Sequence, residues 1–223
     1  MMNGILIINK PAGPTSHDVV DKIRKLTETQ KVGHAGTLDP FARGVLIILI
    51  GKATKLSENF LKQDKTYIAT LLLGKESDTY DKTGKIKNIN DRRPKIKEIK
   101  KILKSFVGEI EQKPPMFSAI KVKGQKLYEL AHQGKKIELA PRLVKIHSIK
   151  ILKYNYPEVK IEVKCASGTY IRSLAHDTGK KLKTGALLKE LIRTQSGKFR
   201  IKDAVKLENL TKENIKKYIK ESC

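Results

Sequence analysis

The chain has 223 residues and carries 47 lysines and arginines against 23 aspartates and glutamates, a formal net charge of +24. This length can bury a sizeable core and is typical of one domain, and 39% hydrophobic residues is typical of a globular protein. No signal peptide and no apolar run long enough to span a membrane is recognisable. The two cysteines, Cys165 and Cys223, match no metal-ligand spacing and offer no disulfide framework, so we expect a reduced, cytoplasmic setting.

The excess of positive charge predicts a polyanionic partner. Of the 47 basic residues 39 are lysines, a bias that an AT-rich genome produces, but codon bias does not explain why so many charges stay unbalanced. A field of this size attracts nucleic acid and makes its binding depend on salt. A membrane surface is less favoured as the partner, because a basic membrane helix needs aromatic anchors and tryptophan is absent.

The chain opens with a predicted strand, Gly4–Asn9, which ends in a proline-rich turn at residues 10–14. Lys10, judged from this local pattern alone, is a solvated strand end. Ser16 is a candidate N-cap for a following helix, because a serine side chain can accept a backbone N–H there. The apolar face of this helix would consist of Val19, Val20, Ile23 and Leu26.

Residues 33–44 form the most informative loop. An Asp-Pro pair such as Asp39-Pro40 usually just opens a turn or a helix. Here three glycines surround Asp39 with backbone that can approach a ligand closely. The next residues, Val45–Ile50, predict a buried strand that would hold the loop at the rim of a rigid core. We therefore interpret Asp39 as a reactive residue.

After this loop, residues 53–61 predict a helix, and Lys65–Leu73 predict a strand. Tyr67 in this strand is, on its own, typical of a core aromatic residue with a solvated hydroxyl. Residues 74–84 predict a loop that carries two carboxylates three residues apart. We reject a metal site or an acid–base pair there, because no histidine or further acid lies near enough in the sequence.

The second half of the chain begins with a basic segment. Lys82–Lys104 holds ten basic and two acidic residues, and Pro94 opens a predicted helix within it. Such a run usually forms a solvated face, but this one supplies a third of the excess charge, so we interpret it as a contributor to RNA steering. Leu143–Lys153 and Val159–Cys165 alternate apolar and polar residues and predict antiparallel strands, and a helix opens at residues 167–175.

The sequences GHAGTLDPFARGVL at residues 33–46 and GKATK at residues 51–55 resemble the TruB family of bacterial tRNA pseudouridine(55) synthases. The family carries Gly-His-x-Gly-x-Leu-Asp-Pro-x-Ala-x-Gly-x-Leu at fixed spacing, which is far more specific than a short phosphate-loop pattern. A second family block matches residues 114–132, although His132 stands where the family has arginine. Gly-Thr-Tyr-Ile-Arg-Ser-Leu at residues 168–174 and a Leu-Arg-Arg-Thr-like string with Ile192 complete a resemblance that covers about residues 4–199.

This resemblance implies an α+β pseudouridine-synthase fold, with a mixed, mainly antiparallel sheet, flanking helices and a thumb insertion at about residues 113–143. It also implies one catalytic domain that comprises residues 1–223. Many relatives continue into a small RNA-binding PUA domain. We expect none here, because the residues after 199 form a single Lys-rich amphipathic stretch.

The resemblance further implies roles for individual residues. Asp39 is the catalytic carboxylate, and Tyr67 lies against the target base. His34 occupies the space that the base leaves when it swings out, although a role as a hydrogen-bond donor that stabilises the loop stays open. Asp81 pairs with the active-site residue Arg172. Active-site support is also assigned to Lys10, Tyr170 and Leu191, and RNA contacts to Lys121, Lys123, Lys126 and Arg142.

The implied activity is the isomerisation of uridine to pseudouridine at position 55 in the T-loop of tRNA. The reaction neither adds nor removes atoms, so we expect no cofactor and no metal. Asp39 needs no proton removed to act as a nucleophile, and Arg172 would keep it ionised. Attack at the sugar C1′, attack at the base C6 and removal of a sugar proton all remain open. We expect a monomer; the alternatives are a non-catalytic RNA-binding or tRNA-folding module and a related guide-RNA-dependent subunit.

Overall fold

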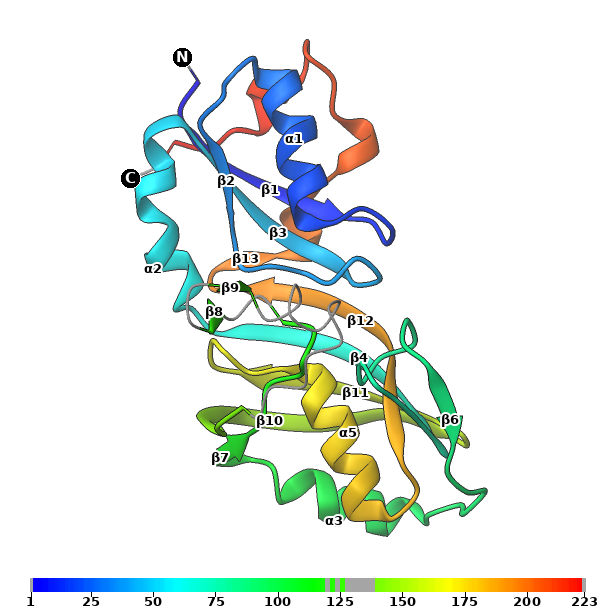
Figure 1. Cartoon of the computed structure of the whole chain (residues 1–223). Helices are drawn as coiled ribbons and strands as arrows, with labels where there is room; N and C mark the ends of the chain where they lie inside the picture. The colour runs from blue at the N-terminus through cyan, green and yellow to red at the C-terminus, as the bar shows by residue number, and fades with distance from the viewer. Residues whose placement is uncertain (1, 119–120, 123–124, 127–138, 222–223) are drawn as a thin grey trace. The chain divides into compact units, whose positions relative to one another are not determined.

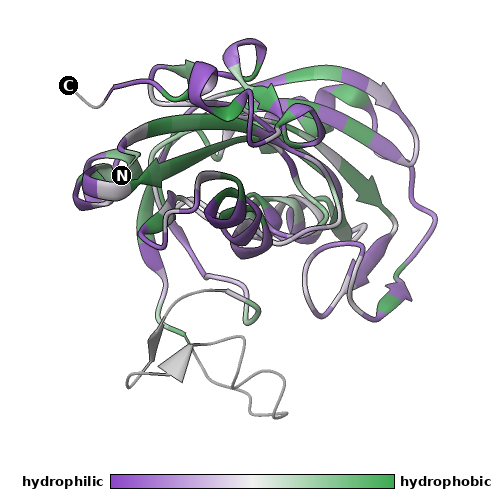
Figure 2. Ribbon diagram, turned by 90° about the horizontal axis from the view of Figure 1, so that it is seen from above, coloured by the Kyte–Doolittle hydropathy of each residue, from purple (hydrophilic) through white to green (hydrophobic). Residues whose placement is uncertain are grey.

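The structure is a computed structural model that describes residues 2–118, 121–122, 125–126 and 139–221. The chain divides into two compact units. The first unit comprises Met1–Ile68 with Glu190–Cys223, and the second unit comprises Ala69–Lys189. Hydrophobic residues concentrate in the strands, whereas the connecting segments are mostly hydrophilic (Figure 2).

Ten strands of the described chain form one mixed sheet (Figure 1). The order along its main path is β14-β1-β3-β12-β4-β11-β10-β7, with β2 paired to β3 and β13 paired to β12. Two pairings are parallel, β1 with β14 and β3 with β12, whereas β1–β3, β2–β3, β7–β10, β10–β11 and β12–β13 are antiparallel. These strands are β1 (Gly4–Lys10), β2 (Val32–Ala35), β3 (Arg43–Ile50), β4 (Lys65–Leu73), β7 (Gly108–Gln112), β10 (Arg142–Asn155), β11 (Glu158–Cys165), β12 (Ala186–Ser196), β13 (Phe199–Arg200) and β14 (Val205–Lys206).

The core of the first unit is built on β1 and β3. The two strands pair with Ile7 opposite Ile47, and every side chain of the apolar run 45–50 is at most 1% exposed. A strand buried on both faces shows such a continuous apolar run, so the predicted strand is confirmed. Helix α1 (Ser16–Thr27) packs beside β2 and buries Val19, Val20 and Ile23.

Helix α1 begins one residue earlier than predicted. Its N-cap is Thr15, whose side chain accepts the Asp18 N–H at 3.0 Å while the Asp18 carboxylate accepts the Thr15 N–H at 2.8 Å. The Ser16 hydroxyl, which is 2% exposed, instead accepts the N–H of Leu38 at 2.9 Å and donates to its carbonyl at 3.1 Å. Ser16 therefore ties α1 to the backbone next to Asp39 rather than capping the helix.

The predicted helix at residues 53–61 is only partly confirmed. The chain forms a 3₁₀ helix over Gly51–Leu56, where the Thr54 hydroxyl donates to the Gly51 carbonyl at 2.8 Å, and then helix α2 (Ser57–Leu61). Phe60 of α2 contacts Phe199, with ring centroids 6.0 Å apart, so this segment covers one edge of the core. Three further 3₁₀ turns follow β13, at Ile201–Asp203, Leu207–Asn209 and Ile215–Tyr218.

In the second unit, the antiparallel pair β10–β11 and helices α3 (Ile96–Lys104) and α5 (Ile171–Leu182) form the packed centre (Figure 1). Helix α3 packs beside α5 and β10. The predicted strands and the predicted helix opening are confirmed here. The prediction of a loop over residues 74–84 is wrong for β5 (Lys75–Ser77), which pairs with β6 (Ile86–Asn88).

Most of the predicted thumb, including Lys123 and His132, lies outside the described residues. Only the backbone of the hairpin β8 (Lys121–Val122) and β9 (Gln125–Lys126) is described, with Lys121 paired to Lys126. None of the helices in the described ranges is long and apolar enough to cross a membrane. That residues 1–223 act as one catalytic domain stays a prediction.

Gly44 should tolerate no side chain, because the backbone of the neighbouring strand β12 lies too close to it. Gly44 has φ +106°, and a Cβ there would lie 2.2 Å from the Arg193 carbonyl oxygen. Gly13 is a matched control, with φ +110° and nothing within 4 Å of its Cβ position. We expect Gly13→Ala to lose about 1–2 kcal/mol from backbone strain alone, and Gly44→Ala to lose more than about 4 kcal/mol. Urea unfolding measures both, and equal losses would contradict the close approach.

Candidate functional site

Asp39 is half-buried in the loop that joins β2 to β3, which we call the Asp39 loop (residues 36–42). The Asp39 carbonyl accepts the Ala42 N–H at 3.0 Å. Three side chains from other parts of the first unit hold the rest of this backbone, and Ser16 on Leu38 is one of them. The other two are basic residues, Lys10 and Arg193.

Lys10 lies at the end of β1 and is completely buried. Its ammonium donates to the carbonyl oxygens of Pro11 at 2.8 Å, Pro40 at 3.2 Å and Ala42 at 2.9 Å. Three carbonyls thus match its three donors. The interpretation of Lys10 as a solvated strand end is therefore wrong, because the side chain is buried and the Asp39 loop takes two of its three hydrogen bonds.

Burial lowers the pKa of Lys10 to about 8, since a dry environment disfavours the charged form. Asp39 and Asp18 oppose this shift in pKa, whereas the Arg193 cation adds to it. Lys10 is therefore mostly charged at neutral pH. The same interaction shows that the Lys10 ammonium and the Asp39 carboxylate lie close enough for their charges to attract.

Arg193 extends from β12 beneath the same loop and is 1% exposed. Its Nε donates to the Val45 carbonyl at 2.7 Å, and one Nη donates to the Gly36 carbonyl at 2.9 Å. A longer contact of 3.5 Å joins the other Nη to the Thr37 carbonyl. Sequence analysis assigned no role to this residue. The signal that could have marked it is its place two residues after the buried Leu191, on the same face of β12.

His34 lies on β2, just before the Asp39 loop. Burial lowers the pKa of His34, and the Arg193 and His17 charges lower it further, so its imidazole is neutral at pH 7. Its Nδ1 atom is buried and has no hydrogen-bond partner among the described residues. Tyr67 on β4 and Leu191 on β12 are 9% and 7% exposed, and both belong to the same unit.

Arg172 and Asp81 form a buried ion pair in the second unit. The Arg172 Nη1 lies 3.5 Å from Asp81 Oδ2, and the two residues are 6% and 3% exposed. The other carboxylate oxygen accepts the Thr79 hydroxyl at 2.8 Å, the Thr83 N–H at 2.8 Å and the Thr83 hydroxyl at 2.5 Å. Arg172 also donates to the Phe117 carbonyl at 2.8 Å. The pairing that the resemblance implied is present, and its role at the base stays a prediction.

Gln112 fixes the start of α5 in the second unit, and sequence analysis did not find it. Its side-chain amide is 1% exposed, donates to the Tyr170 carbonyl at 3.0 Å and accepts the Tyr170 N–H at 2.8 Å. Ser173, one turn further on, donates to the Lys113 carbonyl at 2.7 Å. Tyr170 and Arg172 are thus carried on a helix end that is anchored to β7. The predicted ionic contact between Arg172 and Asp39 joins residues of different units and stays a prediction.

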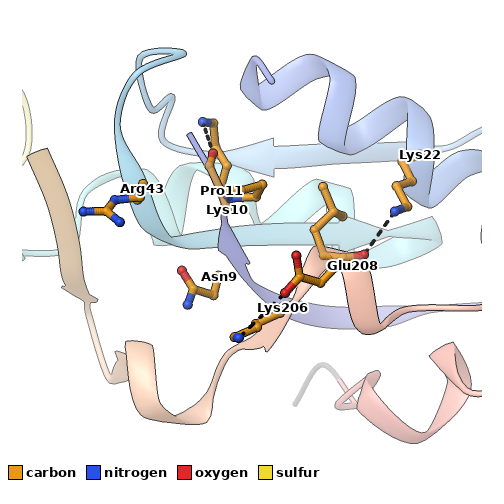
Figure 3. A pocket seen from close by; sticks show the side chains of 8 residues that line it. Asn9, Lys10, Pro11, Lys22, Arg43, Lys206 and Glu208 are labelled. Carbon is orange, nitrogen blue, oxygen red and sulfur yellow. Dashed lines mark hydrogen bonds and ion pairs between the residues drawn. The ribbon is translucent and has the colours of Figure 1, made fainter. Parts of the chain in front are cut away.

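A pocket of about 320 Å³ opens in the first unit beside Asn9 and Lys10 (Figure 3). Lys22 donates across it to the Leu207 carbonyl at 3.1 Å, and the Lys206 ammonium lies 3.7 Å from Glu208. Arg43 and Lys206 are exposed in this lining and could meet an anion, whereas Lys10 is buried and bound to backbone carbonyls. The full lining consists of Asn9, Lys10, Pro11, Lys22, Arg43, Lys206, Leu207 and Glu208.

Other basic side chains lie on the surface of the second unit. All ten basic residues of the segment 82–104 are exposed, and so is Arg142 at the start of β10. Arg92 is partly engaged, since it donates to the Leu182 carbonyl and pairs with Glu98. No group of three or more His, Cys, Asp or Glu residues in the described part of the chain could hold a metal ion.

Residues 24–171 match the family model described as "TruB family pseudouridylate synthase (N terminal domain)". Residues 172–222 match the model described as "tRNA pseudouridylate synthase B C-terminal domain". The chain belongs to the TruB family. It is 49% identical to tRNA pseudouridine synthase B of Clostridium novyi (strain NT), over 98% of this chain and 75% of that protein. The protein of the same name from Endomicrobium trichonymphae is 46% identical, over 93% of this chain and 91% of that one.

Solved structures are similar in fold to this TruB-family chain. A crystal structure titled as a Cbf5-Nop10-Gar1 complex matches with a TM-score of 0.74 and 34% identity, over 93% of this chain and 53% of that one. An H/ACA RNP bound to a substrate RNA that contains 2′-deoxyuridine matches with a TM-score of 0.71 and 31% identity. This chain covers 52% of that second chain, so it spans about half the length of both.

The predicted family and the pseudouridine-synthase fold are therefore confirmed. The chain is a tRNA pseudouridine synthase, which is an isomerase. Its Asp39 loop belongs to an enzyme and not to a bare binding module.

The rate of pseudouridine formation should fall as the pH rises through about 8, where Lys10 loses its proton. At one pH unit above that pKa about nine-tenths of the lysine is uncharged, and it then holds the Asp39 loop with fewer donors and no charge. Single-turnover rates between pH 6 and pH 9.5 test this, with tRNA affinity measured at each pH as the control. Lys10→Met should be slow and should lack this alkaline loss. A wild-type rate that stays flat beyond pH 9 would contradict the role of the ammonium.

Proposed function

We propose that the chain converts the uridine at position 55 in the T-loop of tRNA to pseudouridine, with Asp39 acting on a base turned out of the stack. The observation that carries this proposal is the Asp39 loop itself. A half-buried carboxylate stands on a backbone that Lys10, Ser16 and Arg193 hold from below. Such preorganisation is what a reactive group needs and what a simple RNA-binding loop does not need.

The reaction breaks the N1–C1′ bond and joins C5 of the same base to C1′. The proton on C5 leaves, and N1 ends with a proton, so the base keeps its composition. Asp39 would assist the cleavage as a nucleophile, or as a base that removes a sugar proton. The detached base must stay within reach while it turns. An enclosed site that holds both faces of the base meets that requirement.

The remaining predicted residues take supporting roles in this proposal. Tyr67 supplies a flat ring for the flipped uracil, because stacking tolerates the turning of the base. Leu191 and Tyr170 line its pocket, and His34, which is neutral, fills the space that the base leaves. Arg172, held by Asp81, supplies the positive charge that keeps Asp39 ionised.

Sequence identity to named relatives supports tRNA as the partner. Relatives named tRNA pseudouridine synthase B are 46–50% identical to this chain, whereas the H/ACA and Cbf5 structures are 31–34% identical. This difference favours a tRNA enzyme over a guide-RNA-dependent subunit. The net charge of +24 supplies the attraction for the tRNA, with Arg142, the segment 82–104 and the pocket beside Asn9 as phosphate contacts. We propose that the chain acts as a monomer.

Asp39→Asn separates catalysis from binding. The amide has nearly the shape of the carboxylate, so folding and the RNA-facing surface should survive. The charge that assists N1–C1′ cleavage disappears, so product formed in a single turnover should fall at least about a thousandfold, a loss of about 4 kcal/mol in transition-state stabilisation. The affinity for tRNA, measured by filter binding on the same preparation, should stay within a few-fold of the wild type. Normal product yield would remove Asp39 from the chemistry.

The pocket beside Asn9 should account for part of the salt dependence of tRNA binding. Each phosphate contact contributes a slope of roughly 0.7 to 0.9 in log affinity against log salt. Replacing Arg43 and Lys206 together with serine should lower that slope by about one such contact or more. Lys212→Ser is the control, because Lys212 is exposed and, like Lys206, lies beside one glutamate (Glu28 at 2.8 Å), but does not line the pocket. A slope that changes equally in both variants would exclude the pocket as a phosphate site.

A further inference from the structure

Arg193 is buried in an unusual way for a charged residue. In the described part of the chain, no carboxylate lies within ion-pair distance of its guanidinium, and its hydrogen-bond partners are the backbone carbonyls of Gly36, Thr37 and Val45. Burying a charge without a paired opposite charge is costly, and apolar residues of similar volume are often more stable in such places. Stability of the strand alone therefore does not explain an arginine at this position.

The location of the three carbonyls that Arg193 binds explains better why an arginine stands at this position. Gly36 and Thr37 form the arm of the backbone that leads into Asp39, and Val45 is the third residue of β3, the strand that leads away from it. Arg193 thus ties the entering arm to the strand behind it. Lys10 holds the two carbonyls that follow Asp39, at Pro40 and Ala42. The two cations thus hold the backbone before and after Asp39.

The local backbone is shaped to accept this guanidinium. Gly36 has φ +89°, a backbone conformation that favours glycine, and it brings the Gly36 carbonyl within 2.9 Å of an Arg193 Nη. Gly44 lies opposite Arg193 in the parallel pairing of β3 and β12 and lets the two strands approach. Gly44 therefore makes room for the backbone of Arg193, and Gly36 supplies the conformation that its carbonyl needs to accept from the guanidinium.

We infer that Arg193 is a positioning residue for the isomerisation, which holds the arm before Asp39 so that the carboxylate stays at the reacting position. This inference rests on the proposed role of Asp39. Arg193 itself does not touch the substrate in this account. A residue that positions a reacting group can matter greatly, because a displacement of about 1 Å can reduce a rate about a hundredfold.

The charge of Arg193 also acts on Lys10. The groups that act on Lys10 are Asp39, Asp18 and Arg193. Arg193 lowers the pKa of Lys10, so its removal should raise that pKa. The alkaline loss of activity that depends on Lys10 should then move to higher pH. Arg24 is not among the groups that act on Lys10, so its removal should leave this profile unchanged.

The test compares Arg193→Met with Arg24→Met. Arg24 is the control, because it also donates to two carbonyls in the first unit, Gln30 and Val32 at 3.2 Å each, but both lie outside the Asp39 loop, and it pairs with Asp21 at 2.8 Å. We expect Arg193→Met to slow single-turnover product formation about a hundredfold, with tRNA affinity within threefold of the wild type. Arg24→Met should lower the urea midpoint but leave the single-turnover rate of the folded protein within threefold.

Rescue and the pH profile distinguish positioning from general damage. In Arg193→Ala, millimolar guanidinium should restore part of the rate, and sodium chloride at equal ionic strength should not. In Arg193→Met, the alkaline limb should lie at higher pH than in the wild type. Equal rate losses in the Arg193 and Arg24 variants, or a rate loss with neither rescue nor a shifted limb, would overturn the inference. A fully active Asp39→Asn would refute the proposed function itself, whatever Arg193 does.

Discussion

Hydrogen bonds from two buried cations to the backbone carbonyls of the Asp39 loop are the interaction on which the site depends. Loop carbonyls usually point to water, and a charged side chain at full burial is rare. Here the two meet both requirements, because Lys10 and Arg193 donate to the carbonyls on both sides of Asp39, so that the buried cations have acceptors and the loop carbonyls have donors. Ser16 completes the arrangement at Leu38. The loop thereby gains the rigidity of the sheet beneath it.

The second unit applies the same principle to a cation. Asp81 is oriented by the hydroxyls of Thr79 and Thr83, and it in turn holds Arg172, while Gln112 fixes the backbone at Tyr170. The charged groups of the candidate site are thus set before any RNA arrives, which avoids the cost of ordering them during the reaction. Other residues, the exposed lysines and arginines of the surface, attract the tRNA. Binding and chemistry can therefore be altered separately by substitution.

Local sequence pattern was sufficient for the elements whose burial follows from their own residues. The strands predicted from the apolar run 45–50 and from the alternation in β10 and β11 are confirmed. The family motifs pointed to Asp39 and Arg172, and the ion pair of Arg172 with Asp81 that they implied is present. The buried roles of Lys10 and Arg193 were beyond such patterns, because two of the three Lys10 acceptors lie 30 and 32 residues away and the Arg193 acceptors lie 148 to 157 residues away. Ser16 was misjudged for the same reason, since Leu38 takes the hydroxyl that a local rule assigns to the helix.

Hydrogen exchange at two amides tests the central claim that the Asp39 loop is held rigid from beneath. The Leu38 N–H donates to Ser16, and the Ala42 N–H donates to the Asp39 carbonyl. In the free wild-type protein both should exchange far more slowly than exposed loop amides. Arg193→Met or Lys10→Met should accelerate them while Ile47 in β3 stays protected. Rapid exchange of both amides in the wild type would show that the loop is not preorganised and would contradict this account.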